Sequence, residues 1–440
     1  MNNQNLQIQA DEIVKVAQLD EANYESYEEY LGQNKTEQNP NNFNNVFKYV
    51  VFCILLIPLM VAGMYIWKVD YNSNNLLNNI YTGWDASNYF AIAKNGYLDK
   101  YNEYPKSIFR MAFYPALPIL ISIGSFTKIW FLDLVFNLLA NGFLAYTLSQ
   151  FIAKVWNIGK SLELNNFIFW SFLLFPFLAF LHFNYTEVYF LACTFGIFNF
   201  LNANKIWKSQ ILGIIMGFFR PTALPFGVMA WLYFAINYYK EYKSNPTKIS
   251  IFNTLSDFIF KSLGFLSYGV GSVCLFLYYQ FAYGNWRLFF EAQTEYFGKK
   301  NDINFITNTV NDVLGKNSFW YDRSSWYVDK IRVSGFEFYT PQFNLVFLLW
   351  IPFTIAIVGS LVLIFKKKWY WLLYSWFLLI FAITSNTVSF NRYLLSSFPL
   401  LFGFAYLFQH SRYSRYFLII IYFIMFVLTL VLFTHGFWIG

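Results

Sequence analysis

Long apolar runs, separated by short polar turns, constrain the fold of this chain more than any other feature of its sequence. They recur from about residue 47 to about residue 434, and about 20 apolar residues are enough to carry a helix across a bilayer. Only 12% of the 440 residues are charged, whereas soluble domains carry roughly 25%. The sequence therefore predicts an all-α, polytopic membrane protein.

We expect about 10–11 transmembrane helices, one for each strong apolar run. The runs are 47–67, 131–153, 166–181, 188–203, 210–219, 222–239, 261–283, 343–365, 369–383, 391–408 and 416–434. One further apolar segment, 115–126, is short and holds two prolines, so a half-span or a re-entrant segment is expected there. The pattern indicates a single membrane domain, although length alone would suggest two or three soluble domains.

Lys and Arg fall at alternate turns between these runs. They are Lys154 and Lys160, Lys205 and Lys208, Lys240, Lys243 and Lys248, Lys366, Lys367 and Lys368, and Arg412 and Arg415. Because positive residues gather in cytoplasmic loops, we expect a cytoplasmic N-terminus and an external C-terminus. The net charge of +7 is then a signal of topology, and no nucleic-acid partner is expected.

The segments outside the apolar runs complete the predicted organisation. Residues 1–46 hold eight acidic residues against two lysines and are expected to form a disordered, acidic cytoplasmic tail. The membrane domain then covers 47–440 and carries a large external first loop, 68–130, and a second external loop, 284–342. Aromatic and charged residues in the second loop favour a partly helical cap at the membrane interface.

Cysteine and histidine usage gives no sign of a metal site. The three cysteines and three histidines lie far apart, at Cys53, Cys193, Cys274, His182, His410 and His435. The cysteines lie inside apolar runs, where free Cys behaves as a small core residue. We therefore expect neither a metal nor a cofactor.

Ionisable residues beside the spans are predicted to meet on the external side. Asp85, Glu187, Arg220 and Arg392 all fall in or next to the turns assigned to that side. An ionisable group at membrane depth costs a few kcal/mol to insert and is a functional-site hypothesis by default. Residues of both signs on one side indicate a polar cavity at that interface.

The two acidic residues each allow two interpretations. Asp85 could act as a general base if a hydroxyl comes within about 2.6–3.2 Å, and it could equally cap the helix predicted to follow it. Glu187 at a helix start is stabilised by the helix dipole, and its location on the same side of the membrane as Asp85 also suits a catalytic or acceptor-binding role. Both interpretations stay open for each residue.

The two arginines raise a similar choice. Arg220, next to Pro221 at a sharp break between two apolar runs, could be an anchor at the interface or a phosphate ligand. Arg392 is a positive residue on the side where such residues are rarer, which favours a specific anion partner. Two function classes fit: an enzyme acting on a phospholipid-type substrate, and a lipid or small-molecule transporter or flippase. The lack of internal repeats favours the enzyme.

Six short motifs occur in order along the chain. They are Trp84-Asp85 with Ile92-Ala93 and Gly96-Tyr97; Ala112-Phe113-Tyr114-Pro115-Ala116-Leu117-Pro118; Tyr185-Thr186-Glu187; Arg220-Pro221-Thr222; Tyr283-Gly284 with Ala292-Gln293 and Phe297-Gly298; and Arg392-Tyr393-Leu394-Leu395 with Phe398-Pro399. In this order they resemble GPI mannosyltransferase II, the PIG-V-like family of GT-C membrane glycosyltransferases, over about residues 47–410. The version Arg-Pro-Thr-Ala-Leu and the Ala-Gln pair look more like prokaryotic members.

The resemblance implies a GT-C-type helical bundle and a reaction. Mannose, or a related sugar, would pass from a polyprenyl or dolichyl phosphate donor to a lipid-linked glycan in one inverting displacement, without a metal. Asp85 would be the base, and Arg392, with Arg220, would stabilise the departing phosphate. The resemblance further implies a set of substrate-binding residues: Trp84, Tyr185, Glu187, Gln293 and Asn391.

The resemblance also bounds partners and location. Membrane lipid, a polyprenyl-phosphate-linked sugar and a glycolipid or glycan acceptor are the expected partners, and an accessory membrane subunit stays open. The protein would reside in the endoplasmic reticulum membrane in a eukaryote, where the pathway is GPI-anchor biosynthesis. In a bacterium it would reside in the plasma (inner) membrane and act on a cell-envelope acceptor.

Overall fold

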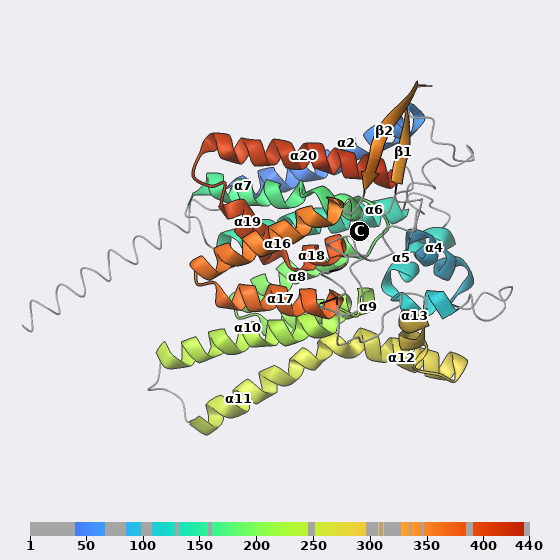
Figure 1. The fold of residues 1–440 in the computed structure, drawn as a ribbon. Helices are drawn as coiled ribbons and strands as arrows, with labels where there is room; N and C mark the ends of the chain where they lie inside the picture. Colours follow the sequence, from blue (N-terminus) through green and yellow to red (C-terminus); the bar gives the residue numbers. More distant parts are fainter. Residues whose placement is uncertain are drawn as a thin grey trace, which may run out of the picture.

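The computed structural model describes residues 40–66, 85–97, 108–127, 132–156, 161–244, 251–295, 327–333, 336–344, 347–383 and 390–434, together with positions 307 and 311. Within these ranges the chain is helical, as predicted, apart from one two-stranded β-hairpin (Figure 1). Residues 1–39, which hold most of the predicted acidic tail, lie outside the described residues.

The helices form a long bundle with a smaller group of elements at one end (Figure 1). The bundle contains α2 (Pro40–Ile66), α6 (Leu132–Phe151), the π-helical turn η2 (Ile152–Trp156), α7 (Leu162–Leu173), η3 (Pro176–His182), α8 (Glu187–Asn202), α9 (Ile206–Phe219), α10 (Ala223–Ser244), α11 (Ile251–Leu263), η4 (Gly264–Gly269), α12 (Val270–Tyr283), α16 (Phe347–Phe365), α17 (Trp369–Ile383), α18 (Phe390–Ser396), α19 (Phe398–Tyr406) and α20 (Arg412–Thr434). The end group contains α4 (Asp85–Asn95), η1 (Ile108–Ala112), α5 (Ala116–Thr127) and α13 (Leu288–Glu295).

Every predicted apolar run contains a helix, and the differences have local causes. The first helix begins at Pro40, before the expected start at residue 47. The run 166–181 is broken between α7 and η3, which are bent by 62° at Pro176. The run 391–408 is divided near Pro399, which stands in the first turn of α19. Proline cannot donate the helical hydrogen bond and clashes with the preceding turn, so breaks at these points are expected.

Helices long and apolar enough to cross a membrane are present. Among the described residues there are three, Leu132–Trp156, Phe252–Tyr283 and Arg412–Leu430, or four if the bent pair α7 and η3 is one span. Shorter apolar helices lie at Asn44–Pro58, Ile206–Phe219, Trp350–Phe365 and Trp369–Ile380. The structure is thus that of a helical protein with membrane-spanning character, and the number of 10–11 spans stays a prediction.

Close contacts between backbones set the packing of α16 on α19. A Cβ atom added to Gly359 would lie 2.1 Å from the carbonyl oxygen of Leu400, and one added to Gly403 would lie 2.7 Å from that of Gly359. Only a hydrogen atom fits at such distances. Small residues allow this approach, which is the usual basis of helix association in lipid.

The end group has an apolar core of its own, separate from that of the bundle. Buried side chains of α4, η1, α5, α12 and α13 form it, among them Tyr89, Met111, Tyr279 and Phe289, and α9 adds Phe219 at its end. We call this group, including the second half of α12, the cap. It is built from the described parts of the predicted first loop, 85–97 and 108–127, and from the start of the second, so these parts of the first loop are folded.

Local signals explain the cap elements. Helix α4 ends at Asn95, and Gly96 follows with φ of +77°, the left-handed conformation that glycine adopts readily at a helix end. Helix α5 has 12 residues, or about 18 Å of helix. That length is too short for a hydrocarbon core of about 30 Å, in agreement with the half-span expected at 115–126.

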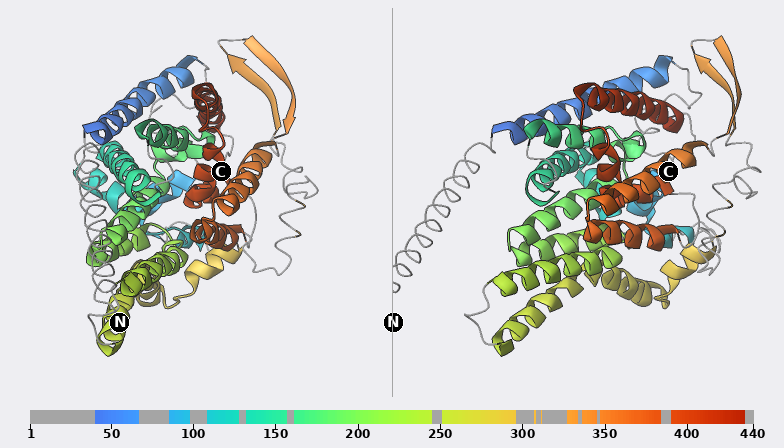
Figure 2. Two further views of the ribbon diagram at one scale, coloured as in Figure 1. Left: turned by 90° about the vertical axis from the view of Figure 1, so that its left-hand side faces the viewer. Right: turned by 60° about the vertical axis from the view of Figure 1, so that its left-hand side comes forward.

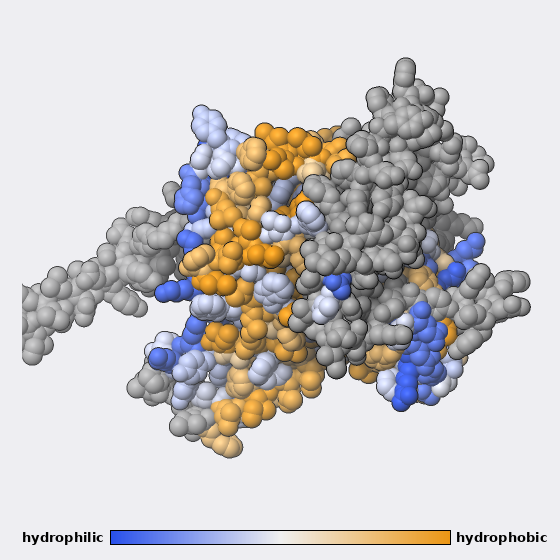
Figure 3. Space-filling view, in the orientation of Figure 1, coloured by the Kyte–Doolittle hydropathy of each residue, from blue (hydrophilic) through white to orange (hydrophobic). Residues whose placement is uncertain are grey.

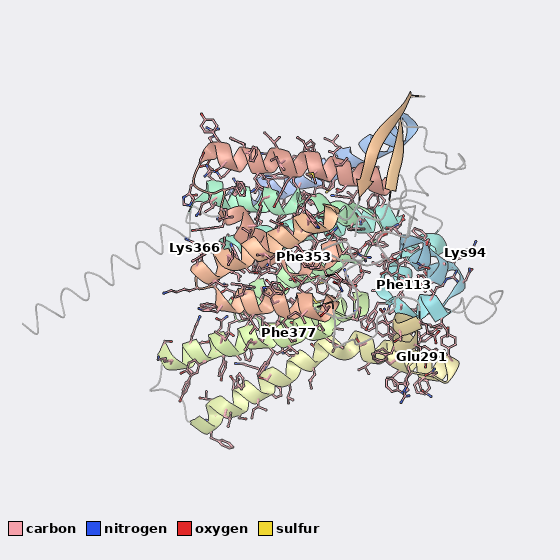
Figure 4. The ribbon with its side chains drawn as sticks, in the orientation of Figure 1. Lys94, Phe113, Glu291, Phe353, Lys366 and Phe377 are labelled. Atoms are coloured by element: carbon pink, nitrogen blue, oxygen red, sulfur yellow. The ribbon has the colours of Figure 1, made fainter. Side chains whose placement is uncertain are left out.

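The two ends of the bundle differ in character. Lys366 lies at the end opposite to Lys94, Phe113 and Glu291 of the cap (Figure 4). At the Lys366 end, basic turns meet: Lys366 lies over the Tyr406 ring at 4.6 Å, and Arg415 pairs with Glu163 at 2.5 Å. Between the ends, apolar side chains form a broad band, with hydrophilic residues along the edge on the Lys366 side (Figure 3). The band is what a bilayer would cover.

The β-hairpin comes from the second loop. Strand β1 (Tyr327–Val333) pairs antiparallel with β2 (Phe336–Asn344). It extends beyond the bundle at the cap end (Figure 2). The partly helical character expected for 284–342 is met by α13, and the hairpin is an element that the sequence interpretation did not include.

Candidate functional site

Four charged side chains from distant parts of the sequence form one chain of contacts where the cap meets the bundle. Arg392 Nη1 donates to Asp85 Oδ2 at 2.6 Å, and its Nε donates to Glu187 Oε1 at 2.7 Å. Arg220 Nη1 forms an ion pair with the same Glu187 Oε1 at 2.8 Å. The order along the chain of contacts is Asp85, Arg392, Glu187, Arg220. Charges alternate and sum to zero.

Each of these residues lies at a helix end. Asp85 and Glu187 are the first residues of α4 and α8, and Arg220 is the residue at which α9 ends. Arg392 lies in the first turn of α18. Acidic residues at helix N-termini are stabilised by the dipole, so the helix starts themselves favour the two carboxylates. Asp85 comes from the cap, and the other three come from the bundle.

Glu187 is the buried centre of the site. Its side chain is only 2% exposed, and both arginine side chains are 9% exposed. Burial would raise the pKa of the Glu187 carboxyl, but Arg220 and Arg392 outweigh it, and the pKa is lowered from its ordinary value. Glu187 is therefore a charged carboxylate that holds both guanidinium groups.

Aromatic rings complete the surroundings of the arginines. The Arg392 guanidinium lies 5.1 Å from the Tyr185 ring centre and 5.3 Å from that of Phe180, and Arg220 lies 5.7 Å from that of Phe190. Guanidinium groups over aromatic faces are stabilised by the ring quadrupole. Each arginine is thus fixed by both a carboxylate and a ring.

Asp85 differs from Glu187 in exposure and in the number of arginines it contacts. Its side chain is 23% exposed, and among the described residues it forms an ion pair with Arg392. The second oxygen of Glu187, Oε2, is buried and has no hydrogen-bond partner among the described residues. The site therefore offers Asp85 as its more accessible carboxylate and Glu187 Oε2 as a buried hydrogen-bond acceptor.

The predicted site residues are placed as follows. Asp85, Glu187, Arg220 and Arg392 come together, and Tyr185 contacts Arg392 through its ring. Asn391 precedes Arg392 on α18 and is 2% exposed. Gln293 belongs to a different set of contacts in the cap. Trp84 lies outside the described residues.

Gln293 and two tyrosines fix the backbone of the turn that ends in Phe113. Three successive carbonyl oxygens accept side-chain hydrogen bonds: Met111 from Tyr279 at 2.9 Å, Ala112 from Gln293 at 3.4 Å, and Phe113 from Tyr97 at 3.0 Å. The motif 112–118 is therefore held by structural contacts. The Gln293 amide nitrogen is engaged with backbone, while its oxygen is buried without a partner in the described part.

Sequence reasoning missed two contributors near the site. Asp133, in the first turn of α6, accepts a hydrogen bond from Asn184 at 3.1 Å. A lone acid at the start of an otherwise uncharged apolar helix was the available signal. Phe180 gave no signal, because it stands among many phenylalanines in an apolar run.

Metal ligands are not gathered at this site. Among the residues that the structure describes, no group of three or more His, Cys, Asp and Glu side chains could hold a metal ion. The arrangement can instead bind an anion through its guanidinium groups and accept a proton at Asp85.

No known protein family, curated protein or solved structure matches the chain.

Proposed function

We propose that this protein is a membrane glycosyltransferase. It transfers mannose, or a related sugar, from a polyprenyl or dolichyl phosphate donor to a lipid-linked glycan, as the resemblance to GPI mannosyltransferase II implies. The observation that carries the proposal is the chain of contacts Asp85–Arg392–Glu187–Arg220. Residues from four of the six motifs meet there, more than 300 positions apart at the extremes.

The proposed reaction needs a base and a stabilised leaving group. Asp85 accepts the proton of the acceptor hydroxyl, and that oxygen forms a bond to the anomeric carbon from the face opposite the phosphate. The bond from the anomeric carbon to the phosphate oxygen breaks, and its electron pair leaves with the polyprenyl phosphate. Arg392 stabilises that charge, and inversion follows from the single displacement.

The remaining residues of the site assist in this scheme. Arg220 adds a second fixed positive charge beside the phosphate. The buried oxygen Oε2 of Glu187 accepts a hydrogen bond from a sugar or acceptor hydroxyl, because an unsatisfied buried acceptor is costly. Tyr185 limits the space beside Arg392. A membrane-facing apolar surface (Figure 3) suits a substrate with a lipid tail.

Sugar transfer in membranes tests the proposal. Membranes from cells that express wild type or Asp85→Asn receive labelled polyprenyl-phosphate mannose and an extract of candidate acceptors, without added divalent metal. We expect labelled product from wild type and a loss of about 100-fold or more in Asp85→Asn, which is the usual contribution of a general base. The labelled product identifies the acceptor.

The matched control is Asp257→Asn. Asp257 also pairs with a basic residue at 2.6 Å, Lys261, but on α11 and with a side chain 45% exposed. The Asp257→Asn variant should transfer sugar at the rate of the wild type. Transfer that survives in Asp85→Asn would remove Asp85 from the reaction, and no labelling with any donor would favour the transporter.

A further inference from the structure

We propose that Asp85 and the donor phosphate compete for Arg392, so that the phosphate must bind before Asp85 is available as a base. The starting observation is that Asp85 is already engaged: Arg392 Nη1 donates to its Oδ2 at 2.6 Å. While Oδ2 accepts this charge-assisted hydrogen bond, that oxygen is occupied and cannot also take up the proton of an acceptor hydroxyl. The consequence for catalysis rests on the proposed function, but the competition itself does not.

Charge balance shows why an entering anion disturbs this contact. The two carboxylates and two guanidinium groups already sum to zero, and three of the four side chains are less than 10% exposed. An additional negative charge beside Arg392 is costly in such a place unless one carboxylate moves away. The site therefore binds an anion in exchange for a carboxylate.

Burial decides which carboxylate leaves. Glu187 is 2% exposed and contacts both arginines through one oxygen atom. If Glu187 moved away, both buried guanidinium groups would lose this carboxylate. Asp85 is 23% exposed and is the first residue of α4. At a helix N-terminus a carboxylate stays stabilised by the dipole and the free backbone N–H groups. Asp85 is the one that can be released.

The location of Asp85 makes release compatible with an intact bundle. The other three residues belong to bundle helices, whereas of the buried residues of α4 Tyr89 and Ile92 pack in the core of the cap and only Ala86 packs in the core of the bundle. Asp85 can exchange partners by a side-chain rotation or a small shift of α4. Glu187, Arg220 and Arg392 keep their mutual contacts in either case.

The competition predicts that removing the Asp85 carboxylate strengthens phosphate binding, which would not follow if Asp85 were only a base. Farnesyl phosphate is the probe, and its affinity is measured by titration calorimetry with the full chain in detergent. Asp85→Asn should bind it about tenfold more tightly than wild type, equivalent to about 1.4 kcal/mol, although the same variant loses transfer. Farnesol, which lacks the phosphate, should bind equally to both. Asp85→Glu keeps the competing carboxylate and should stay closer to wild type.

A measurement on wild type covers the case in which Asp85→Asn does not fold. Amide hydrogen exchange in the first turn of α4 should become faster when farnesyl phosphate is added, and should not respond to farnesol, because the contact with Arg392 is lost. Equal or weaker binding by a folded Asp85→Asn, or unchanged exchange in α4, overturns the proposal. Tighter binding without transfer by wild type would retain the competition and reject the transferase.

Discussion

Replacing Glu187 by Gln tests the claim that this residue organises the site. Its Oε1 contacts Arg392 Nε at 2.7 Å and Arg220 Nη1 at 2.8 Å, and its side chain is 2% exposed. Gln keeps the shape but removes the negative charge. Arg392 keeps its ion pair with Asp85, while Arg220 loses the carboxylate with which it pairs. Breaking a buried pair by removing one partner costs about 3–5 kcal/mol, and we expect destabilisation in that range.

Glu163→Gln is the matched control, because it is the same substitution in an ion pair of similar length. Glu163 contacts Arg415 at 2.5 Å, but its side chain is 64% exposed. Water and salt screen such a pair, so its loss should cost at most about 1 kcal/mol. Thermal unfolding of both variants in the same detergent, followed by tryptophan fluorescence, gives the comparison.

A double variant separates charge balance from simple loss of packing. Glu187→Gln with Arg220→Gln removes one negative and one positive charge and leaves Arg392 with Asp85. The two changes should therefore be less than additive, and the double variant should be more stable than the sum of the single effects predicts. If Glu187→Gln unfolds at the same temperature as Glu163→Gln, the organising role is wrong. Full additivity would reject the shared contact with Arg220.

Two further predictions concern the packing around the site. Gly359→Val should destabilise the protein strongly or prevent its accumulation, because even a Cβ atom there would lie 2.1 Å from the Leu400 carbonyl oxygen. The control Gly142→Ala, whose Cβ would meet Val50 at 3.5 Å, should be tolerated. Equal thermal stability of the two variants would contradict the backbone contact. Tyr279→Phe removes the hydrogen bond to the Met111 carbonyl at 2.9 Å and should lower the free energy of unfolding by about 1 kcal/mol. The same thermal assay measures this change, and unchanged stability would show that the hydrogen bond does not hold the turn.

Long apolar runs were sufficient to predict most helices of the bundle. Apolar runs gave the positions of nearly all bundle helices. Breaks inside runs were harder, because Pro176 and Pro399 lie in segments whose hydropathy is continuous. Hydropathy indicates which segments are buried in lipid or protein, and it does not indicate where a helix bends.

The sequence predicted that Asp85, Glu187, Arg220 and Arg392 share one side of the membrane, and the structure brings the four side chains together. Alternation of basic turns placed them together, and the resemblance gave each a role. The partners could not be predicted. That Glu187 contacts both arginines, and that Asp85 contacts Arg392, depends on how α8, α9 and α18 meet. Long-range packing of this kind leaves no local pattern in the sequence.

The division of the site between two apolar cores explains why its two carboxylates differ. The bundle supplies Glu187 with both arginines, and this group is buried and fixed by rings and charge. The cap supplies Asp85, which is more exposed and stands at the start of a short helix. Guanidinium groups held at fixed positions are suited to stabilising negative charge in the proposed reaction. The base of the proposed reaction must instead reach the acceptor and release its proton to solvent, and the more exposed carboxylate at the edge of the cap is suited to both.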